Sequence, residues 1–359
     1  MPDTHYRTPS DLRWSCHGCG KCCSSGLELG PVEPDVIDEL LDSDIQKRWP
    51  AASAGFHTTR TDAQGHPYHV LRQHDGRCVF LRPDDLCAVH ALLGPESKPG
   101  FCREFPYLFV DDPKGTVAVI RPACGSFPKS FQRGDTVGPE LSSVAHVRRA
   151  APRSRWFPDA VTVLPGLAVS ADNWLQLEEP LLQGLSMHPA PPTESIARIR
   201  SALTTATGRD VPEPSPQRYE QALGALLHVF EHMLIQVVEQ GPEGEPHQMR
   251  FIESSLARVR RARAAEAPVW ETTSIAYANL CLRSMLLSKG FSAWGGLPEG
   301  LGVFLLGVEV SWRAGDADVE SFGEHLAEWV RLRDHRMGST LLRRAAAATR
   351  DLFLHAGDA

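Results

Sequence analysis

Apolar residues recur at helical spacing through most of the chain beyond residue 193. The clearest case is 216–240, where they fall three or four positions apart, as one face of an amphipathic helix requires. The apolar positions of this segment are Tyr219, Leu223, Leu226, Phe230, Met233 and Val237. Comparable patterns predict helices over 194–206, 216–240, 247–265, 271–288, 300–313, 318–336 and 338–355. We therefore expect this part of the chain to be mainly α-helical.

The first 150 residues have a different pattern, with short apolar runs broken by glycine and proline. Runs at 69–72 and 78–81 predict two strands, because the Asp-Gly pair between them supplies the positive φ that a hairpin turn needs. Runs at 105–110 and 116–120 predict a second hairpin. Elements this short make the region a poor candidate for a self-sufficient hydrophobic core.

The other segments of this region carry weaker patterns. An acidic first turn predicts a short helix over 35–41. Residues 83–85 predict a helix start, which would place Cys87 and His90 three positions apart on one helix face. Irregular structure is expected for the arm at 1–14 and the stretch at 50–68.

Together these patterns predict an α+β protein in two parts. A small cysteine-rich domain with short hairpins is expected over 1–150, and an α-helical domain over 193–359. Residues 151–192 are expected to form an irregular connection with one strand-like run, at 161–169.

Composition is that of an ordinary soluble globular protein, with 42% hydrophobic and 23% charged residues among 359. The formal net charge of −7 disfavours a nucleic-acid partner, which selects a basic surface. The first 14 residues lack the apolar core of a signal peptide, and no stretch approaches the roughly 20 apolar residues of a membrane helix. These features predict a cytoplasmic protein without a membrane partner, in which thiols stay reduced.

Eight of the nine cysteines lie within the first 124 residues, and this clustering changes the picture of that region. They are Cys16, Cys19, Cys22, Cys23, Cys78, Cys87, Cys102 and Cys124, whereas Cys281 lies in a helical pattern and is expected in the core. A Cys-x-x-Cys loop brings two thiolates close enough to chelate one ion, and Gly20 lets the turn close. The spacing fits both a zinc knuckle and the three-ligand run of ferredoxin-type iron–sulfur loops.

Adjacent Cys22 and Cys23 bear on the number of metal ions. Because neighbouring side chains diverge, we expect the two thiolates not to complete one tetrahedron, which favours more than one metal or a polynuclear cluster. Cationic side chains next to the cysteines are candidates to offset the thiolate charge: Lys21, Arg77, Arg103 and Arg121. His17 and His90 could each replace a thiolate, or be an exposed loop residue and a helix-surface residue respectively.

Four ordered blocks of sequence resemble the YkgJ-like cysteine-cluster family, a zinc- or iron-chelating domain. They are Cys16–Cys23, Cys78–Leu81, Leu86–His90 and Lys98–Pro106, with Lys98 where the family usually has Arg. The resemblance covers roughly residues 13–128. It implies that all eight clustered cysteines are metal ligands, and it leaves zinc, iron and an iron–sulfur cluster open.

Flagellin lysine-N-methylases are similar at a greater distance, since they carry a comparable cysteine domain followed by a further region. Their first cysteines are more widely spaced than those at 16–23, and nothing in this chain has the strand, glycine-rich turn and helix of a Rossmann-type S-adenosylmethionine site. That similarity implies a second hypothesis, a protein-modifying enzyme that acts on lysine.

Two motifs in the second half admit a functional and a plain interpretation. His228-Val229-Phe230-Glu231-His232 fits the inverted zinc-peptidase signature, but the same residues lie opposite the predicted apolar face and suit a solvated surface. The basic run 258–263 is likewise interpreted as a solvated helix face.

Three functional hypotheses follow from the sequence. The chain is a metal-binding protein with zinc, iron or an iron–sulfur cluster, a lysine-modifying enzyme, or a metal-stapled module whose helical half binds a protein partner. Catalytic residues and the oligomeric state are not indicated.

Overall fold

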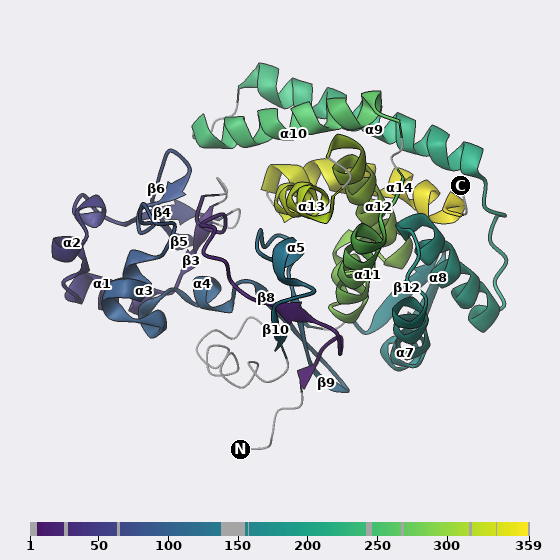
Figure 1. Ribbon diagram of the computed structural model, residues 1–359, viewed down its shortest axis with the longest axis horizontal. Helices are drawn as coiled ribbons and strands as arrows, with labels where there is room; N and C mark the ends of the chain where they lie inside the picture. Colours follow the sequence, from purple (N-terminus) through teal and green to yellow (C-terminus); the bar gives the residue numbers. More distant parts are fainter. Residues whose placement is uncertain are drawn as a thin grey trace.

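The computed structural model describes residues 6–24, 28–62, 65–137, 155–156, 158–241, 246–266, 269–315, 318–334 and 336–357. Short strands and helices make up the N-terminal part, and long helices make up most of the remainder (Figure 1). The predicted α+β class, with a cysteine-rich region followed by a mainly helical one, is confirmed.

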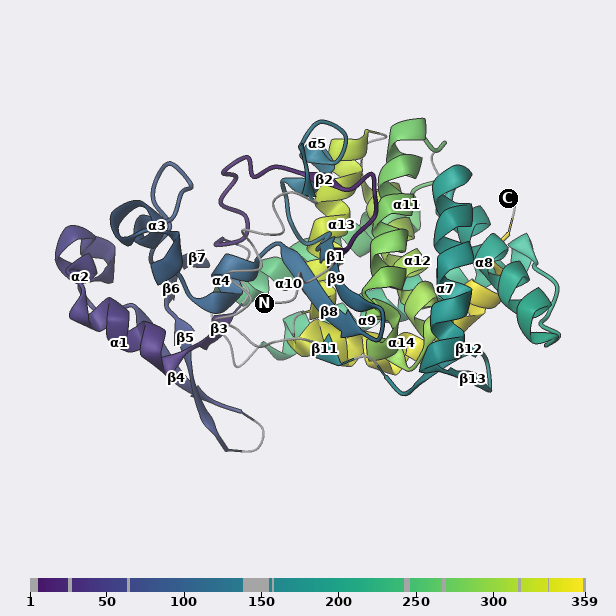
Figure 2. The same cartoon turned by 90° about the horizontal axis from the view of Figure 1, so that it is seen from below.

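A small lobe is formed by residues 28–104. Its sheet has the order β3 (Leu29–Val32), β5 (Pro67–Leu71) and β4 (His57–Thr61), all antiparallel. In Figure 2, β4 and β5 extend from the lobe as a long hairpin. The helices of the lobe are α1 (Pro34–Asp42), α2 (Ile45–Arg48), α3 (Ala88–Leu93) and α4 (Gly100–Glu104), with 3-10 turns at Pro50–Ala52 and Pro95–Ser97.

The small lobe has its own apolar cluster, which corrects the expectation of a region without a core. Leu40, Ile45, Phe56, Phe80 and Ala88 are all buried in it. The predicted loop at 50–68 is also wrong in part, because it contains β4 and the start of β5. Strand β4 was missed because its side chains are nearly all exposed and polar, so they show no alternation.

The hairpin predicted for 69–81 and the helix predicted to begin near residues 83–85 both differ from the structure in position. Asp75 and Gly76 do adopt positive φ angles of 51° and 76°, but they join only β6 (Gln73–His74) and β7 (Arg77–Cys78). Strand β5, which covers most of the predicted 69–72 run, pairs with β3 and β4 instead. Cys87 occupies the N-cap position, one residue before α3 begins. It therefore does not share a helix face with His90 as predicted.

A four-stranded sheet joins the N-terminal arm to the middle of the chain. The predicted second hairpin is present as β8 (Tyr107–Asp112) and β9 (Gly115–Ile120). Strand β1 (Tyr6–Arg7) pairs in parallel with β9, and β11 (Arg155–Trp156) pairs in parallel with β8. Strand β2 (Arg13–Trp14) pairs with β10 (Asp135–Thr136), so the described residues of the arm are not irregular as expected.

All seven predicted helices are present, and each end lies within three residues of its prediction. They are α8 (Pro192–Thr207), α9 (Pro216–Gln240), α10 (Pro246–Ala264), α11 (Thr272–Leu287), α12 (Leu297–Ala314), α13 (Val319–Asp334) and α14 (Arg336–His355). Helix α9 lies alongside α10 (Figure 1). By length and composition alone α9 could also cross a membrane, a weak indication because core helices of soluble proteins pass the same test.

The predicted irregular connection at 151–192 contains regular structure in its described residues. Strands β12 (Ala160–Leu164) and β13 (Leu167–Ser170) form a hairpin, and α7 (Ala171–Met187) follows. Ser170 caps α7 by accepting a hydrogen bond from the Asn173 amide. The signal for this helix was obscured by Pro180, which lies inside it.

The large hydrophobic core spans both parts of the chain. Phe109 of β8 and Phe127 of α5 (Phe127–Ser130) belong to the same buried cluster as Trp174, Tyr277 and Phe322 of the helices. The rings of Phe127 and Tyr277 meet edge to face, with centroids 5.3 Å apart. Apolar packing therefore groups the β8–β9 hairpin with the helices, while the predicted domain boundary near residue 150 stays a prediction.

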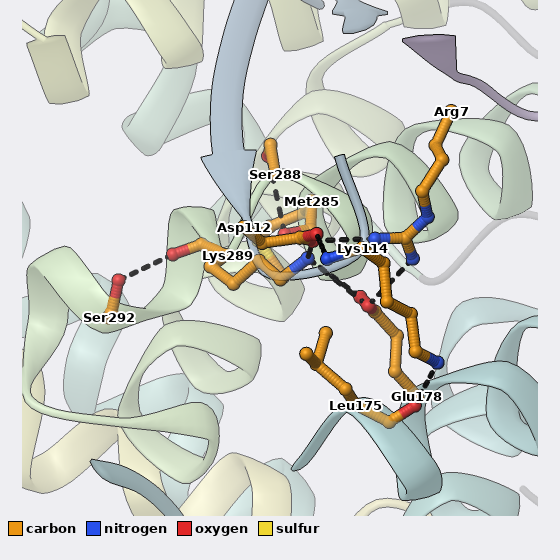
Figure 3. A network of polar contacts seen from close by, with 9 residues as sticks. All are labelled: Arg7, Asp112, Lys114, Leu175, Glu178, Met285, Ser288, Lys289 and Ser292. Atoms are coloured by element: carbon orange, nitrogen blue, oxygen red, sulfur yellow. Dashed lines mark hydrogen bonds and ion pairs between the residues drawn. The ribbon is translucent and has the colours of Figure 1, made fainter. Parts of the chain in front are cut away.

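A buried ionic network fastens the N-terminal arm and the β8–β9 hairpin to the helices (Figure 3). The Lys289 ammonium lies 2.8 Å from an Asp112 oxygen and 2.9 Å from a Glu178 oxygen, and Arg7 lies 2.6 Å from Asp112. Burial opposes ionisation of Asp112, but the hydrogen bond from Lys289 and the charge of Arg7 hold its pKa below the ordinary value. Four segments distant in sequence thus meet around two carboxylates and two cations.

Close helix packing supplies a first stability prediction. A Cβ on Gly302 of α12 would lie 1.9 Å from the Thr349 carbonyl oxygen of α14, so Gly302→Ala should lower the free energy of unfolding by about 1–3 kcal/mol. Gly224 of α9 has open space at its Cβ position, and Gly224→Ala should instead raise stability by about 0.5–1 kcal/mol. Urea unfolding of both variants checks this, and equal effects would contradict the described packing.

Candidate metal centre

The loop that carries the first four cysteines is shaped by two glycines. Gly18 and Gly20 have φ angles of 61° and 62°, which are strained for residues with a Cβ. A Cβ on Gly20 would also lie 2.8 Å from an oxygen of Asp85, so the loop sits directly on the 82–86 turn. The amide of Cys78 donates to the carbonyl of Cys23 at 2.7 Å and fixes the loop to β7.

The remaining cysteines come from four separate places around this loop. Cys78 ends β7, Cys87 caps α3, Cys102 lies in α4 and Cys124 lies in the turn after β9. A bridge between Leu81 and Cys87 holds the α3 cap beside the residues that follow β7. All nine cysteines are free thiols, and Cys281 is buried in the core as predicted.

Cys22 and Cys23 lie closer than expected for neighbours in sequence. Their sulfur atoms are 3.7 Å apart, close to the ~3.8 Å edge of a tetrahedron with zinc–sulfur bonds of ~2.3 Å. The hydrogen bond from Cys23 lowers the pKa of Cys22 to about 6, and that of Cys23 is raised in turn. The turn at 20–23 therefore brings the two sulfurs together, and the argument that neighbouring thiols must diverge is wrong here.

Cys22 interacts electrostatically with several of the other thiols. The pKa of Cys102 is raised, first by loss of solvent and then by the charges of Cys78, Cys87 and Cys22. Burial likewise raises the pKa of Cys124 to about 11, with smaller contributions from Cys19 and Cys22. Cys22 is thus near both the small-lobe thiols and those at Cys19 and Cys124.

Cys16 is exposed, as is Cys22. The sulfur of Cys16 accepts the Gly18 amide at 3.5 Å. Across the residues that the structure describes, no set of three or more cysteine, histidine or acidic side chains has its donor atoms gathered as they would be around one ion. The donor set fits zinc or iron by its chemistry and by the Cys22–Cys23 spacing, and binding would require the other sulfurs to move inward.

Three of the four cations predicted to offset the thiolate charge are paired with carboxylates. Lys21 pairs with Glu324 at 2.8 Å, Arg77 with Asp85 at 3.0 Å and Arg103 with Glu96 at 3.6 Å. The charge of Lys98 instead lowers the pKa of Cys22 and opposes the rise at Cys102.

A further cation comes from the helical part. Arg331 of α13 is close enough to interact with the charges of Cys124, Cys19 and Cys22. The contact of Arg331 with the thiols was missed because its sequence position, in the last turn of a predicted helix, is typical of an exposed basic residue. Arg121 was the fourth cation predicted to offset the thiolate charge. Its backbone carbonyl accepts a hydrogen bond from the Cys124 amide, which helps to shape the turn that holds Cys124.

Both candidate histidines lie at the surface, and their role as metal ligands stays a prediction. His17 and His90 are both exposed, and the backbone amide of His17 donates to the Ser126 hydroxyl at 3.2 Å. These positions agree with the plain interpretation of the two residues, as a loop residue and a helix-surface residue.

The glutamate of the zinc-peptidase-like motif forms two ion pairs. Glu231 is held by Arg260 at 3.0 Å and Arg263 at 2.6 Å, and hydrogen bonds from these two arginines lower its pKa. His228 is exposed, and His232 contacts Gln236 at 3.1 Å. A solvated face accounts for the motif, although Arg258 of the basic run is buried and pairs with Glu328.

Fold and site together define a cysteine-cluster protein in which a small lobe and a helical part meet at a group of thiols. Residues 15–125 match the CxxCxxCC family model, described as a "putative zinc- or iron-chelating domain". The match covers all eight clustered cysteines and less than a third of the chain. No curated protein and no solved structure matches.

Proposed function

We propose that this chain binds zinc or iron through its eight clustered thiols, with Cys22 at the centre of the site. The observation that carries the proposal is the gathering of Cys78, Cys87, Cys102 and Cys124 around one loop from four separate segments. Because the eight thiols exceed the four that one tetrahedral ion uses, the site suits more than one metal or a polynuclear cluster.

Support also comes from charge. Four thiolates on one divalent ion leave a net charge of −2, and Lys98 and Arg331 lie where they offset it. Reduced thiols of this kind suit the cytoplasm, which we propose as the location. Nothing in the described residues favours the lysine-methylase alternative over metal binding alone.

Metal analysis with a visible spectrum, on protein purified without oxygen, tests the proposal. Brown protein that contains iron and sulfide would identify a cluster, and colourless protein with zinc would identify zinc sites. Full-length protein that holds neither metal after gentle purification would refute the proposal.

Matched cysteine variants test the ligand set. Cys22→Ser and Cys102→Ser should each lose at least half of the bound metal, because each removes a thiolate from the group that Cys22 joins. Cys281→Ser removes a buried thiol outside the group and should keep its metal content. Metal content unchanged in all three variants would show that the cluster is not the binding site.

A further inference from the structure

Helix α13 lies directly against the turn that carries Cys124. A Cβ on Gly323 would lie 2.2 Å from Pro128 of α5, so the helix and this segment are in close contact. The α13 side chain of Glu324 pairs with Lys21 of the cysteine loop at 2.8 Å and with Lys129 at 3.4 Å. Figure 1 shows α13 beside α5.

One α13 side chain reaches the site itself. Arg331 is 6% exposed, and its Nε and Nη2 atoms donate to the carbonyl oxygen of Ala123 at 3.1 and 2.8 Å. Ala123 precedes Cys124, so these two bonds fix the backbone that presents that thiol. The guanidinium is also near Cys19 and Cys22.

The charge of Arg331 is balanced only in part. Within the described part of the chain its hydrogen bonds go to a neutral carbonyl. The carboxylate of Glu324 acts on it less than Cys124, Cys19 and Cys22 do, and that carboxylate already pairs with Lys21 and Lys129. A buried cation without full compensation costs roughly several kcal/mol after relaxation. Thiolates that hold a metal carry the compensating negative charge, whereas protonated thiols do not.

We propose that Arg331 is a positioning residue of the metal site, so that the helical part takes part in metal binding. The inference rests on the proposed function. Arg331 holds the Cys124 turn in place and offsets the charge of the metal-bound thiolates. Coupling of this kind is reciprocal: if the packing of α13 favours metal binding, bound metal must stabilise the packing of α13 against the cysteine loop.

Arg200 offers a matched control. It is 5% exposed and donates to the carbonyl oxygens of Phe353, Leu354 and Ala356, so it too is a buried arginine that binds backbone carbonyls. No thiol is among the groups that perturb it. Arg200→Met and Arg331→Met therefore remove the same kind of contact, and only the second removes charge beside the thiols.

The first test titrates full-length protein with Zn²⁺ or Fe²⁺, whichever the purified chain carries, in competition with a chromogenic chelator. Arg331→Met should weaken affinity by roughly 10–100-fold, the usual cost of losing a group that orients metal ligands. Arg331→Lys keeps the charge and should recover most of the loss, while Arg200→Met should stay near wild type. Equal affinity in Arg331→Met and Arg200→Met would overturn the inference, even with metal bound normally by wild type.

The second test needs no variant, and so does not depend on how well Arg331→Met folds. Hydrogen exchange of wild-type amides in α13 should slow at least severalfold when metal is added to chelator-treated protein, while α8 should not change. No change in α13 despite measured metal binding would overturn the inference. Wild type that binds no metal would overturn the proposed function, and this inference with it.

Discussion

Lys289→Met should lower the free energy of unfolding by about 3–5 kcal/mol, because it leaves a buried charge uncompensated. Asp112 and Glu178 would then face one another with only Arg7 to balance them. Lys289 is 3% exposed and Glu178 is 1% exposed, so water cannot replace the lost ammonium. Urea unfolding followed by far-ultraviolet circular dichroism measures the loss.

A second substitution separates charge imbalance from lost packing. Lys289→Met combined with Asp112→Asn leaves Arg7 and Glu178 as a neutral pair 3.4 Å apart, so the double variant should be more stable than Lys289→Met alone. Lys114→Met is the control, since Lys114 is exposed and its ammonium donates to the neutral Leu175 carbonyl, while its backbone amide keeps its bond to Asp112 in the variant. It should cost less than about 1.5 kcal/mol. A double variant less stable than the single one would contradict the described network.

Removing metal from the full chain should loosen the small lobe while most of the helical part stays folded. The lobe has a small apolar cluster of its own, whereas α9–α12 belong to the large core. Metal at about 1,000 times its dissociation constant stabilises the state that binds it by about 4 kcal/mol, and that contribution is lost with a chelator. The free energy of opening of the lobe should fall by this amount.

Hydrogen exchange with mass spectrometry checks this prediction peptide by peptide. Amides of β4, β5 and α4 should exchange faster after chelation, and those of α11 and α12 should not. Chelator already saturated with the same metal is the control. Unchanged protection in the small lobe after complete metal removal would show that the lobe is stable by apolar packing alone.

Sequence periodicity was sufficient for the seven helices after residue 191, because their apolar residues recur at helical spacing, whether the helix buries one face as α9 does or nearly its whole surface as α12 does. It was insufficient for β1 and β2, which are two residues long and are defined by partners more than 100 residues away. The cysteines themselves were evident from their clustering. Arg331 was not, since its role depends on which turn α13 packs against, and no local pattern encodes that contact.

The spacing of Cys22 and Cys23 shows a different limit of reasoning from sequence. Divergence of neighbouring side chains is the rule in an extended chain. The amide of Cys23 instead donates to the carbonyl of Gly20 at 2.9 Å, and this turn brings the two sulfurs together. The turn that Gly20 closes, with its positive φ, is what makes these two neighbours an exception.

The bond from Arg331 to Ala123 has a consequence for the order of events during synthesis. It joins residues 208 positions apart, and a ribosome that adds ~5–20 residues each second needs about 10–40 s to make that interval. The thiols of the first 124 residues therefore emerge well before the arginine that buttresses them. Under the proposed function, the nascent chain would hold these thiols before Arg331 is present to offset their charge.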